Sequence, residues 1–217
     1  MKKFFQHALA LAALGTVAAA AHAAGPDSTN TPNVYVGGGL SFGRASGLGG
    51  KIDDALANQG YGSSSSADKS STNPNLKLGY RISPNFAVEA TYDRIGSMDV
   101  SSVVNGDAAA GHWKSQGLGL HALAIAPLND QWSVYGRLGV ERWHTRMDLG
   151  STDGGPTALA NSGNSTSLVL GAGASYAISR NVDATAELVH YTHVGDAAAT
   201  GRTGVNQVNV GVLYHFL

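Results

Sequence analysis

The sequence has no cysteine, little charge and no long apolar run after its N-terminus, and each shortage removes a class of protein. Without cysteine, neither a disulfide framework nor a thiolate site is available. Charged residues make up 13% of the chain, with 14 basic against 15 acidic residues, so the basic stripe of a nucleic-acid binder is missing. No later run approaches the roughly 18–20 apolar residues that a membrane-spanning helix needs. Such a chain crosses a membrane only as a closed barrel, which satisfies every backbone group in lipid.

Residues 1–23 have the organisation of a secretory signal peptide. Two lysines are followed by an Ala-rich apolar stretch and then by an Ala-His-Ala triplet that fits the small-x-small cleavage rule. We therefore expect export through the Sec pathway and cleavage near Ala23, with a retained anchor as the alternative. Residues 24–32 are polar and turn-forming, which predicts a flexible leader before one barrel domain over residues 33–217.

After the leader, eight segments alternate between apolar and polar residues with a period of two, which is typical of half-buried strands. They lie at residues 33–42, 75–82, 86–95, 117–124, 132–141, 167–176, 182–188 and 207–216. The connections alternate between short and long ones. The short ones lie at residues 83–85, 127–131 and 179–181, and the long ones at 44–74, 96–112, 148–164 and 193–204. This layout predicts an all-β, eight-stranded antiparallel transmembrane β-barrel with three short periplasmic turns and four long extracellular loops.

The first long connection has two parts of different composition. Residues 51–59 are compatible with a short helix. Residues 60–74 are rich in serine, and we expect them to be mobile.

The same alternation also fits a soluble barrel or sandwich, in which the apolar face points inward. Two features favour the inverted arrangement of a membrane barrel. The polar face is crowded with small residues and a few charges, which suits a narrow lumen. The aromatic residues of the apolar face gather at the end with the short turns and predict an interfacial girdle. They are Tyr80, Phe86, Trp132, Tyr176, Tyr214 and Phe216.

Several segments carry a family resemblance. Residues 79–93 read Gly-Tyr-Arg-Ile-Ser-Pro-Asn-Phe-Ala-Val-Glu-Ala-Thr-Tyr-Asp, residues 134–139 read Val-Tyr-Gly-Arg-Leu-Gly, and residues 171–178 read Gly-Ala-Gly-Ala-Ser-Tyr-Ala-Ile. In this order they resemble the strands of the OmpA-like transmembrane domain, over nearly all of the chain after the leader. The resemblance implies an eight-stranded outer-membrane barrel with a partly ion-paired interior. Members often carry a second domain that binds peptidoglycan, and we expect this chain to be without it.

Strand parity places Glu89 and Arg137 inside the barrel. Three further residues are candidates for ion pairs in the lumen: Glu187, Lys77 and Glu141. In OmpA a charged network is thought to gate a narrow passage, and Glu89 and Arg137 match two positions of that interior. Other positions of the network carry Leu123, Ser175 and Thr185 here, so the resemblance does not extend to the whole gate. We therefore favour a structural ion pair over a gate, and the narrow lumen makes a large pore unfavourable.

No residue pattern predicts a catalytic, cofactor-binding or metal site. His190 and His193 are three residues apart, so on a strand they point to opposite faces. His144 lies near Asp148, but no nucleophile, base and orienting group occur at matched spacing. We therefore expect no enzyme, although some outer-membrane barrels act on lipids.

Lys114, Arg142 and Arg146 lie near the long-loop ends of their strands. They are either solvated rim charges or contacts to anionic lipopolysaccharide, and we favour the second. Together the patterns predict a monomeric outer-membrane barrel of a Gram-negative bacterium. Its partners are outer-membrane lipids, lipopolysaccharide and a host or surface ligand bound through the loops, without nucleic acid. The expected role is envelope integrity or adhesion. A low-conductance channel for small solutes is the second hypothesis, and a lipid-active enzyme is the third.

Overall fold

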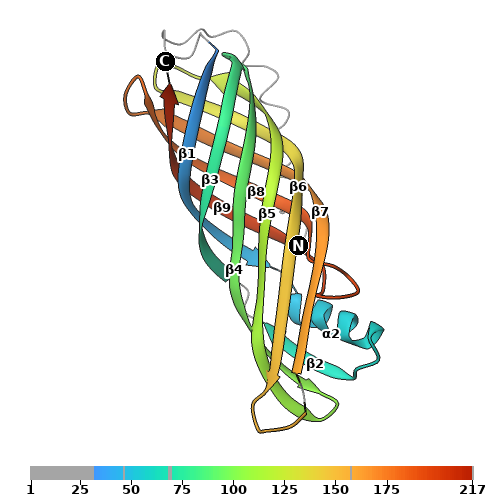
Figure 1. Ribbon diagram of the computed structural model, residues 1–217. Helices are drawn as coiled ribbons and strands as arrows, with labels where there is room; N and C mark the ends of the chain where they lie inside the picture. The colour runs from blue at the N-terminus through green and yellow to red at the C-terminus, as the bar shows by residue number, and fades with distance from the viewer. Residues whose placement is uncertain (1–31, 46, 68–69, 157, 217) are drawn as a thin grey trace, which may run out of the picture.

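Figure 1 shows the computed structural model of the protein, which describes residues 32–45, 47–67, 70–156 and 158–216. The expected signal peptide, and the expected leader up to residue 31, lie outside the described residues. Within the described ranges, no helix has both the length and the apolar character that crossing a bilayer requires.

Eight strands form a closed antiparallel barrel. They are β1 (Asn33–Ala45), β3 (Ser70–Ser83), β4 (Phe86–Val104), β5 (Asp107–Pro127), β6 (Trp132–Ser151), β7 (Ala158–Ala177), β8 (Val182–Val194) and β9 (Thr203–Phe216). Each strand pairs with the next one along the chain, and β9 pairs back with β1. The ring is therefore complete, and the predicted eight-stranded barrel is confirmed. We name the two ends of the barrel the turn end, where residues 84–85, 128–131 and 178–181 connect the strands, and the extended end opposite.

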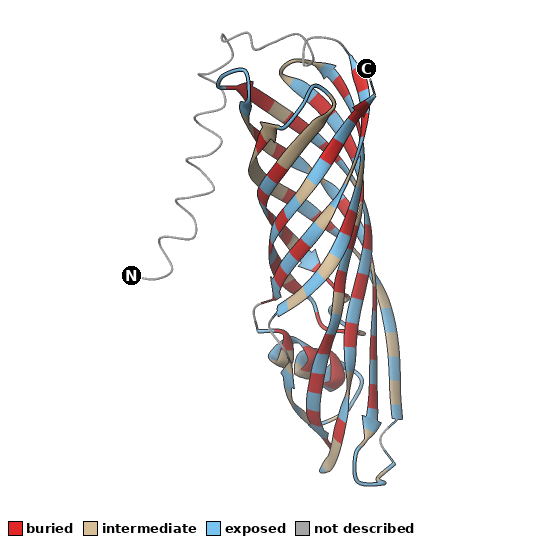
Figure 2. Cartoon of the chain, turned by 90° about the vertical axis from the view of Figure 1, so that its left-hand side faces the viewer, coloured by how far each residue is buried: buried red, intermediate tan, exposed pale blue. Residues whose placement is uncertain are grey.

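Over the half next to the turn end the barrel is apolar outside, and its interior is mostly polar, with a small apolar cluster that includes Ala87, Leu123, Ile125 and Leu213. The exposed fractions of Leu78 and Leu120 are 54% and 63%, whereas those of Glu89 and Arg137 are 2% and 5%. Figure 2 shows the alternation as buried and exposed bands along each strand. Water would not favour this arrangement, but acyl chains do. We name the exposed apolar residues of this half the apolar belt: Val34, Val36, Leu40, Phe42, Leu76, Leu78, Leu118, Leu120, Leu138, Val140, Leu168, Leu188, Val208, Val210 and Val212.

Two of the four predicted long connections are mostly strand. β4 and β5 continue to a two-residue turn at Asn105 and Gly106, whose φ angles are 50° and 96°. Likewise β6 continues to Ser151 and β7 already begins at Ala158. The prediction of long loops at residues 96–112 and 148–164 was therefore wrong in length, because polar strands keep pairing beyond the apolar belt. An Asn-Gly pair favours a two-residue hairpin, so the sequence contained a signal for the first of these turns.

The first connection is also more regular than the sequence predicted. It contains the helix α2 (Leu48–Asn58), close to the expected position, and the strand β2 (Ser63–Ala67). β2 pairs with residues 100–104 of β4, and β3 already begins at residue 70, so most of the described residues between 60 and 74 are strand. Their mobility stays a prediction. Asp53 of α2 holds β2 in place, because its carboxylate accepts hydrogen bonds from Ser63 Oγ at 2.8 Å and from Ser65 N at 3.1 Å.

The extended end has an apolar core, which α2 covers. This core, which we name the apolar plug, contains Leu48, Ile52, Leu56, Ile95, Met98, Trp113, Trp143, Met147, Val169, Tyr191, Val194 and Val205, among others. Its two indole rings are fully buried, and Trp143 meets Tyr191 edge-on with ring centroids 5.2 Å apart. Inward-facing side chains are therefore apolar at this end of the barrel, in contrast to the lumen next to the turn end.

Candidate functional site

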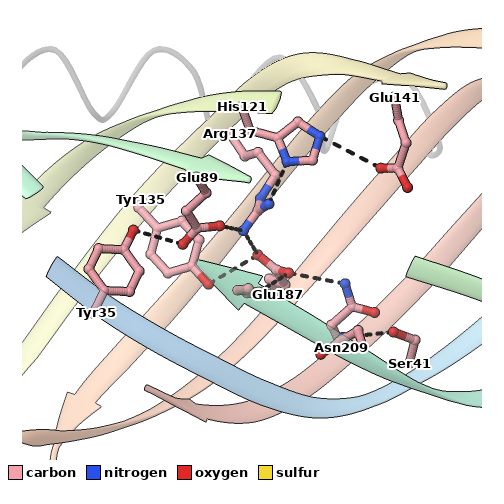
Figure 3. A network of polar contacts seen from close by, with 11 residues as sticks. Tyr35, Ser41, Glu89, His121, Tyr135, Arg137, Glu141, Glu187 and Asn209 are labelled. Carbon is pink, nitrogen blue, oxygen red and sulfur yellow. Dashed lines mark hydrogen bonds and ion pairs between the residues drawn. The ribbon is translucent and has the colours of Figure 1, made fainter. Parts of the chain in front are cut away.

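The lumen holds a cluster of buried charges centred on Arg137 of β6. Arg137 Nη2 donates to Glu89 Oε2 of β4 at 2.5 Å and lies 3.0 Å from Glu187 Oε2 of β8. Lys77 Nζ of β3 donates to Glu187 Oε1 at 2.5 Å. Figure 3 shows the guanidinium group between the two carboxylates. Four of the five lumen candidates therefore meet, and two cations balance two anions. This balance offsets the cost of burying the charges.

Two tyrosines and an asparagine complete the hydrogen bonds of this charged cluster. Tyr35 Oη donates to Glu89 Oε1 at 2.9 Å, and Tyr135 Oη donates to Glu187 Oε2 at 3.2 Å. Asn209 Nδ2 donates to Glu187 Oε1 at 3.0 Å. The sequence analysis did not select these three residues. A tyrosine on the polar face of a strand was the available signal, because a buried phenol needs a hydrogen-bond partner.

Glycines on neighbouring strands make room for both tyrosine rings. Gly79 is the direct partner of Tyr35 in the β1–β3 ladder, and Gly173 is the direct partner of Tyr135 in the β6–β7 ladder. A Cβ atom on either glycine would collide with the ring opposite it. Each ring therefore lies across a neighbouring strand and reaches a carboxylate further along the lumen wall.

His121 connects the charged cluster to Glu141. Arg137 Nη1 lies 2.8 Å from His121 Nδ1, and since a guanidinium group only donates, Nδ1 accepts this hydrogen bond. The ring proton of a neutral His121 is then on Nε2, which lies 3.7 Å from Glu141 Oε2. Neither carboxylate oxygen of Glu141 has a hydrogen-bond partner. Glu141, the fifth lumen candidate, therefore lies outside the charged cluster, between the cluster and the apolar plug.

The apolar plug closes the lumen on the other side of Glu141. Trp143 follows Glu141 on the inward face of β6, and its exposed fraction is 0%. Trp113 of β5 is equally buried, and its Nε1 donates to the carbonyl oxygen of Thr200 at 3.0 Å. This bond ties the connection at residues 195–202 to the barrel wall. Fully buried side chains therefore fill the lumen at two levels, first as ion pairs and then as apolar rings.

The six predicted girdle aromatics lie at the turn end of the outer surface. Trp132 and Tyr176 are neighbours on β6 and β7, with ring centroids 4.9 Å apart, and Tyr214 and Phe216 of β9 are 5.1 Å apart. Tyr80 and Phe86 are exposed on either side of the β3–β4 turn. The arrangement fits aromatic rings at a membrane–water interface.

The three predicted rim cations lie together on the outer face, just beyond the apolar belt. Lys114 of β5 is the direct partner of Arg146 of β6, and Arg142 lies opposite Leu118, where the belt ends on β5. All three are exposed. We name them, with His144, the cationic patch, because Arg146 Nε donates to His144 Nε2 at 3.2 Å. Arg44 and Arg94, which the sequence analysis did not select, are also exposed, two residues beyond Phe42 and Tyr92 on their strands.

Three histidines near the extended end, His112, His144 and His190, have ordinary polar partners. His190 Nδ1 lies 2.8 Å from Asn206 Oδ1, and His112 Nδ1 lies 2.8 Å from Asp99 Oδ1. His144 Nδ1 lies 3.0 Å from Asn164 Oδ1, and no hydrogen bond or ion pair is found between His144 and Asp148. Within the ranges that the structure describes, no three His, Asp or Glu side chains group as metal ligands.

Comparison with known proteins gives one consistent result. The family model of the OmpA-like transmembrane domain matches residues 29–217. Outer membrane protein A of Salmonella typhi is 32% identical over 139 residues, which are 64% of this chain and 38% of that protein. The chain thus spans well under half of that relative.

Two solved structures share the fold. Neisserial surface protein A superposes with a TM-score of 0.56 at 18% identity, over 86% of this chain and all of the other. Ail, the attachment invasion locus protein of Yersinia pestis, was solved in complex with the heparin analogue sucrose octasulfate. It gives a TM-score of 0.54 at 19% identity, over 85% of this chain and 99% of that one.

Proposed function

This chain belongs to the OmpA-like transmembrane domain family, and from that premise we propose that it acts in the bacterial outer membrane as a structural and surface-binding protein. The protein is an outer-membrane β-barrel, and the relatives described above are barrels of the same kind. In this proposal it is a monomer without enzymatic activity, its turn end faces the periplasm, and its extended end faces the outside of the cell.

The closed lumen is the observation that carries the proposal. The charged cluster and the apolar plug fill the barrel at successive levels, and Arg137, Glu141 and Trp143 are at most 5% exposed. A continuous water path would have to break the ion pairs and displace buried indole rings. The outer face and the extended end are then the surfaces left for function, and passage of solutes is the less favoured alternative.

Lipopolysaccharide is the first partner that we propose. The cationic patch begins where the apolar belt ends. In the proposed orientation, this boundary faces the phosphates of the outer leaflet. Arginine and lysine bind phosphate through charge-assisted hydrogen bonds. Ail, a barrel of the same fold, was solved with a polyanionic heparin analogue, which supports anionic ligands as a class to test here.

The binding test uses the full chain in lipid nanodiscs and purified lipopolysaccharide. Replacing Lys114, Arg142 and Arg146 together by serine should weaken binding at least tenfold, while heat-modifiable migration on a gel stays unchanged. Arg180→Ser is the matched control, because Arg180 is exposed at the turn end, far from the patch. Equal affinity of the triple variant and the wild type would remove lipopolysaccharide from the proposal.

Conductance separates the surface role from the channel alternative. The wild-type barrel in planar bilayers should give no discrete current across a range of voltages. Discrete currents in the wild type that increase in Trp143→Ala would support the channel, because this change removes a side chain that blocks the lumen. Incubation with labelled phospholipid and lipopolysaccharide, followed by mass spectrometry, should show no modified lipid.

A further inference from the structure

The first half of β7, at the extended end, has a neighbouring strand on one side only. β6 pairs with β7 along residues 158–176, whereas β8 pairs with it only from residue 169 onward. In Figure 1 the long strands β4 to β7 continue past the ends of their shorter neighbours. Residues 158–166 alternate between exposed and intermediate, and none of them is buried. We name this stretch the open edge. Its outward-facing side chains are exposed, whereas on the inner face Leu159 packs against the apolar plug and Asp196 lies against Gly163.

The other edge of the same extended sheet is covered. There β2 is the outermost strand, and Asp53 of α2 accepts hydrogen bonds from the backbone N–H of Ser65 and the hydroxyl of Ser63. At the open edge, the connection at residues 195–202 and α2 contribute less. The Ser165 hydroxyl donates to the carbonyl of His193 at 3.4 Å, and Asn161 Nδ2 donates to Gln59 Oε1 at 3.1 Å. These contacts involve side chains of β7. Among the described residues, no hydrogen bond from β8 or from residues 195–202 to the backbone of residues 158–166 is found.

The sequence of the open edge has none of the usual protection against strand pairing. Edge strands are normally blunted by lysine, proline, inward charges or a bulge. Residues 158–166 read Ala-Leu-Ala-Asn-Ser-Gly-Asn-Ser-Thr, without a charge or a proline, and their pairing with β6 continues without a bulge. Alternate N–H and C=O groups of this edge are therefore positioned to bind another strand about 4.8 Å away.

The charges beside the open edge define the partner. On the outer face, Arg142, His144 and Arg146 of β6 lie directly opposite Thr166, Asn164 and Ser162 of β7. These β7 side chains are short, so the arginines can extend over them toward a strand added at the edge, about 10 Å from β6. Asp148 lies further along, opposite Ala160, and is the one outward acid of β6 in this stretch.

We propose that the open edge of β7 binds an extended acidic peptide segment of a partner protein by strand addition, with Asp or Glu at alternate positions beside Ser162, Asn164 and Thr166. The inference deepens the proposed surface-binding role and rests on it. A second copy of this chain is the less favoured occupant, because it would bring a second cationic patch to the same face.

The test measures the binding of synthetic peptides to the full chain in nanodiscs. An alternating Glu-Thr peptide should bind and should slow amide hydrogen exchange within residues 158–166. The same peptide with alternate amides N-methylated should bind at least tenfold more weakly, because it cannot form the ladder. An alternating Lys-Thr peptide should also bind at least tenfold more weakly, because it meets the cationic patch with like charge.

Variants of the open edge add a second, independent readout. The N–H of Leu168 points toward β8, where it donates to Thr192 Oγ1, and the N–H of Ala177 donates to Gln131 on the β6 side, so even-numbered residues of β7 direct their N–H to the open edge. Ser162→Pro therefore removes an N–H that faces the open edge, and Gly163→Pro removes one that faces β6. Ser162→Pro should keep heat-modifiable migration and lose at least tenfold in peptide affinity. Gly150→Ala is the control, since a Cβ on that residue meets no atom within 4 Å.

Three outcomes would overturn the inference. Equal binding of the N-methylated peptide would exclude strand addition, and equal binding of the Lys-Thr peptide would exclude the acidic partner. Dimers of the wild type that disappear in Ser162→Pro would assign the open edge to a second copy of this chain. Lipopolysaccharide binding is measured in parallel, so loss of peptide binding alone would leave the proposed function intact.

Discussion

Along β6 the same alternation of side chains carries opposite chemistry in its two halves. Near the turn end, Arg137 and Glu141 point inward while Leu138 and Val140 point outward. Beyond that point the faces exchange character, with buried Trp143 and Met147 inside and the cationic patch outside. The backbone and the period of two do not change. The surrounding solvent changes from acyl chains to water, so the apolar face of one strand is outside in the first half and inside in the second.

The largest effect is expected from breaking the charged cluster in the membrane half. Arg137→Ala leaves Glu89 and Glu187 buried, with Lys77 as the one remaining cation in contact with them. Removing one partner of a buried ion pair typically costs about 3–5 kcal/mol. Urea unfolding in lipid vesicles, followed by tryptophan fluorescence, should show this loss. Arg180→Ala, at an exposed position of the turn end, should show none, and equal stability of the two variants would contradict the importance of the cluster.

In the extended half, the corresponding substitution creates a cavity in the apolar plug. Leu56→Ala truncates a fully buried side chain of α2 and should destabilise α2 and the plug by about 3 kcal/mol. Proteolysis and hydrogen exchange should show faster opening of residues 47–67. Exchange of the lumen strands near Glu89 should stay slow. Equal acceleration at both places would mean that the two halves unfold as one unit.

A charge on the lipid-facing surface tests the position of the inversion. Leu138→Arg places a cation on the apolar belt, one residue after Arg137, which points the other way. Arginine at the bilayer midplane costs about 2–4 kcal/mol, and less toward the interface. The loss should appear in lipid vesicles. A loss below about 0.5 kcal/mol would place Leu138 outside the hydrocarbon region.

Removing one hydroxyl group gives a smaller effect within the cluster. Tyr35→Phe deletes the hydrogen bond to Glu89 and leaves the ring in place across Gly79. Hydrogen bonds to charged groups contribute about 1.5–3 kcal/mol, so unfolding in vesicles should show a loss in this range. Tyr214→Phe, on the exposed surface, is the matched control. If both changes cost the same, the hydroxyl of Tyr35 has no special role.

The smallest effect is expected on the outer face of the extended half. Arg146→Leu removes an exposed charge in water and should change the stability by less than about 0.5 kcal/mol. Lipopolysaccharide binding should still fall. A large loss of stability would show that the cationic patch supports the fold rather than binding.

The sequence predicted the strand faces because each depends on its own residues. The period of two within a single strand is enough to predict that Glu89 points inward and Leu78 outward. No information about the neighbouring strand is needed. Contacts between strands were harder, since Tyr35 meets Glu89 only in the correct register of β1, β3 and β4. β2 was missed because four consecutive serines give no apolar alternation, and the strand depends on Asp53 and β4 for its pairing.

The tyrosine–glycine pairs also determine the stagger of the barrel. A period of two cannot distinguish the observed alignment of β1 on β3 from a slip by two residues, since both keep every side chain on its proper face. After such a slip, Tyr35 would lie opposite Lys77 or Arg81 instead of Gly79, and its ring would meet a long side chain. The pair at Tyr135 and Gly173 acts in the same way between β6 and β7. The two tyrosine rings and the two glycines opposite them thus select one strand register among those that the alternation of side chains alone permits.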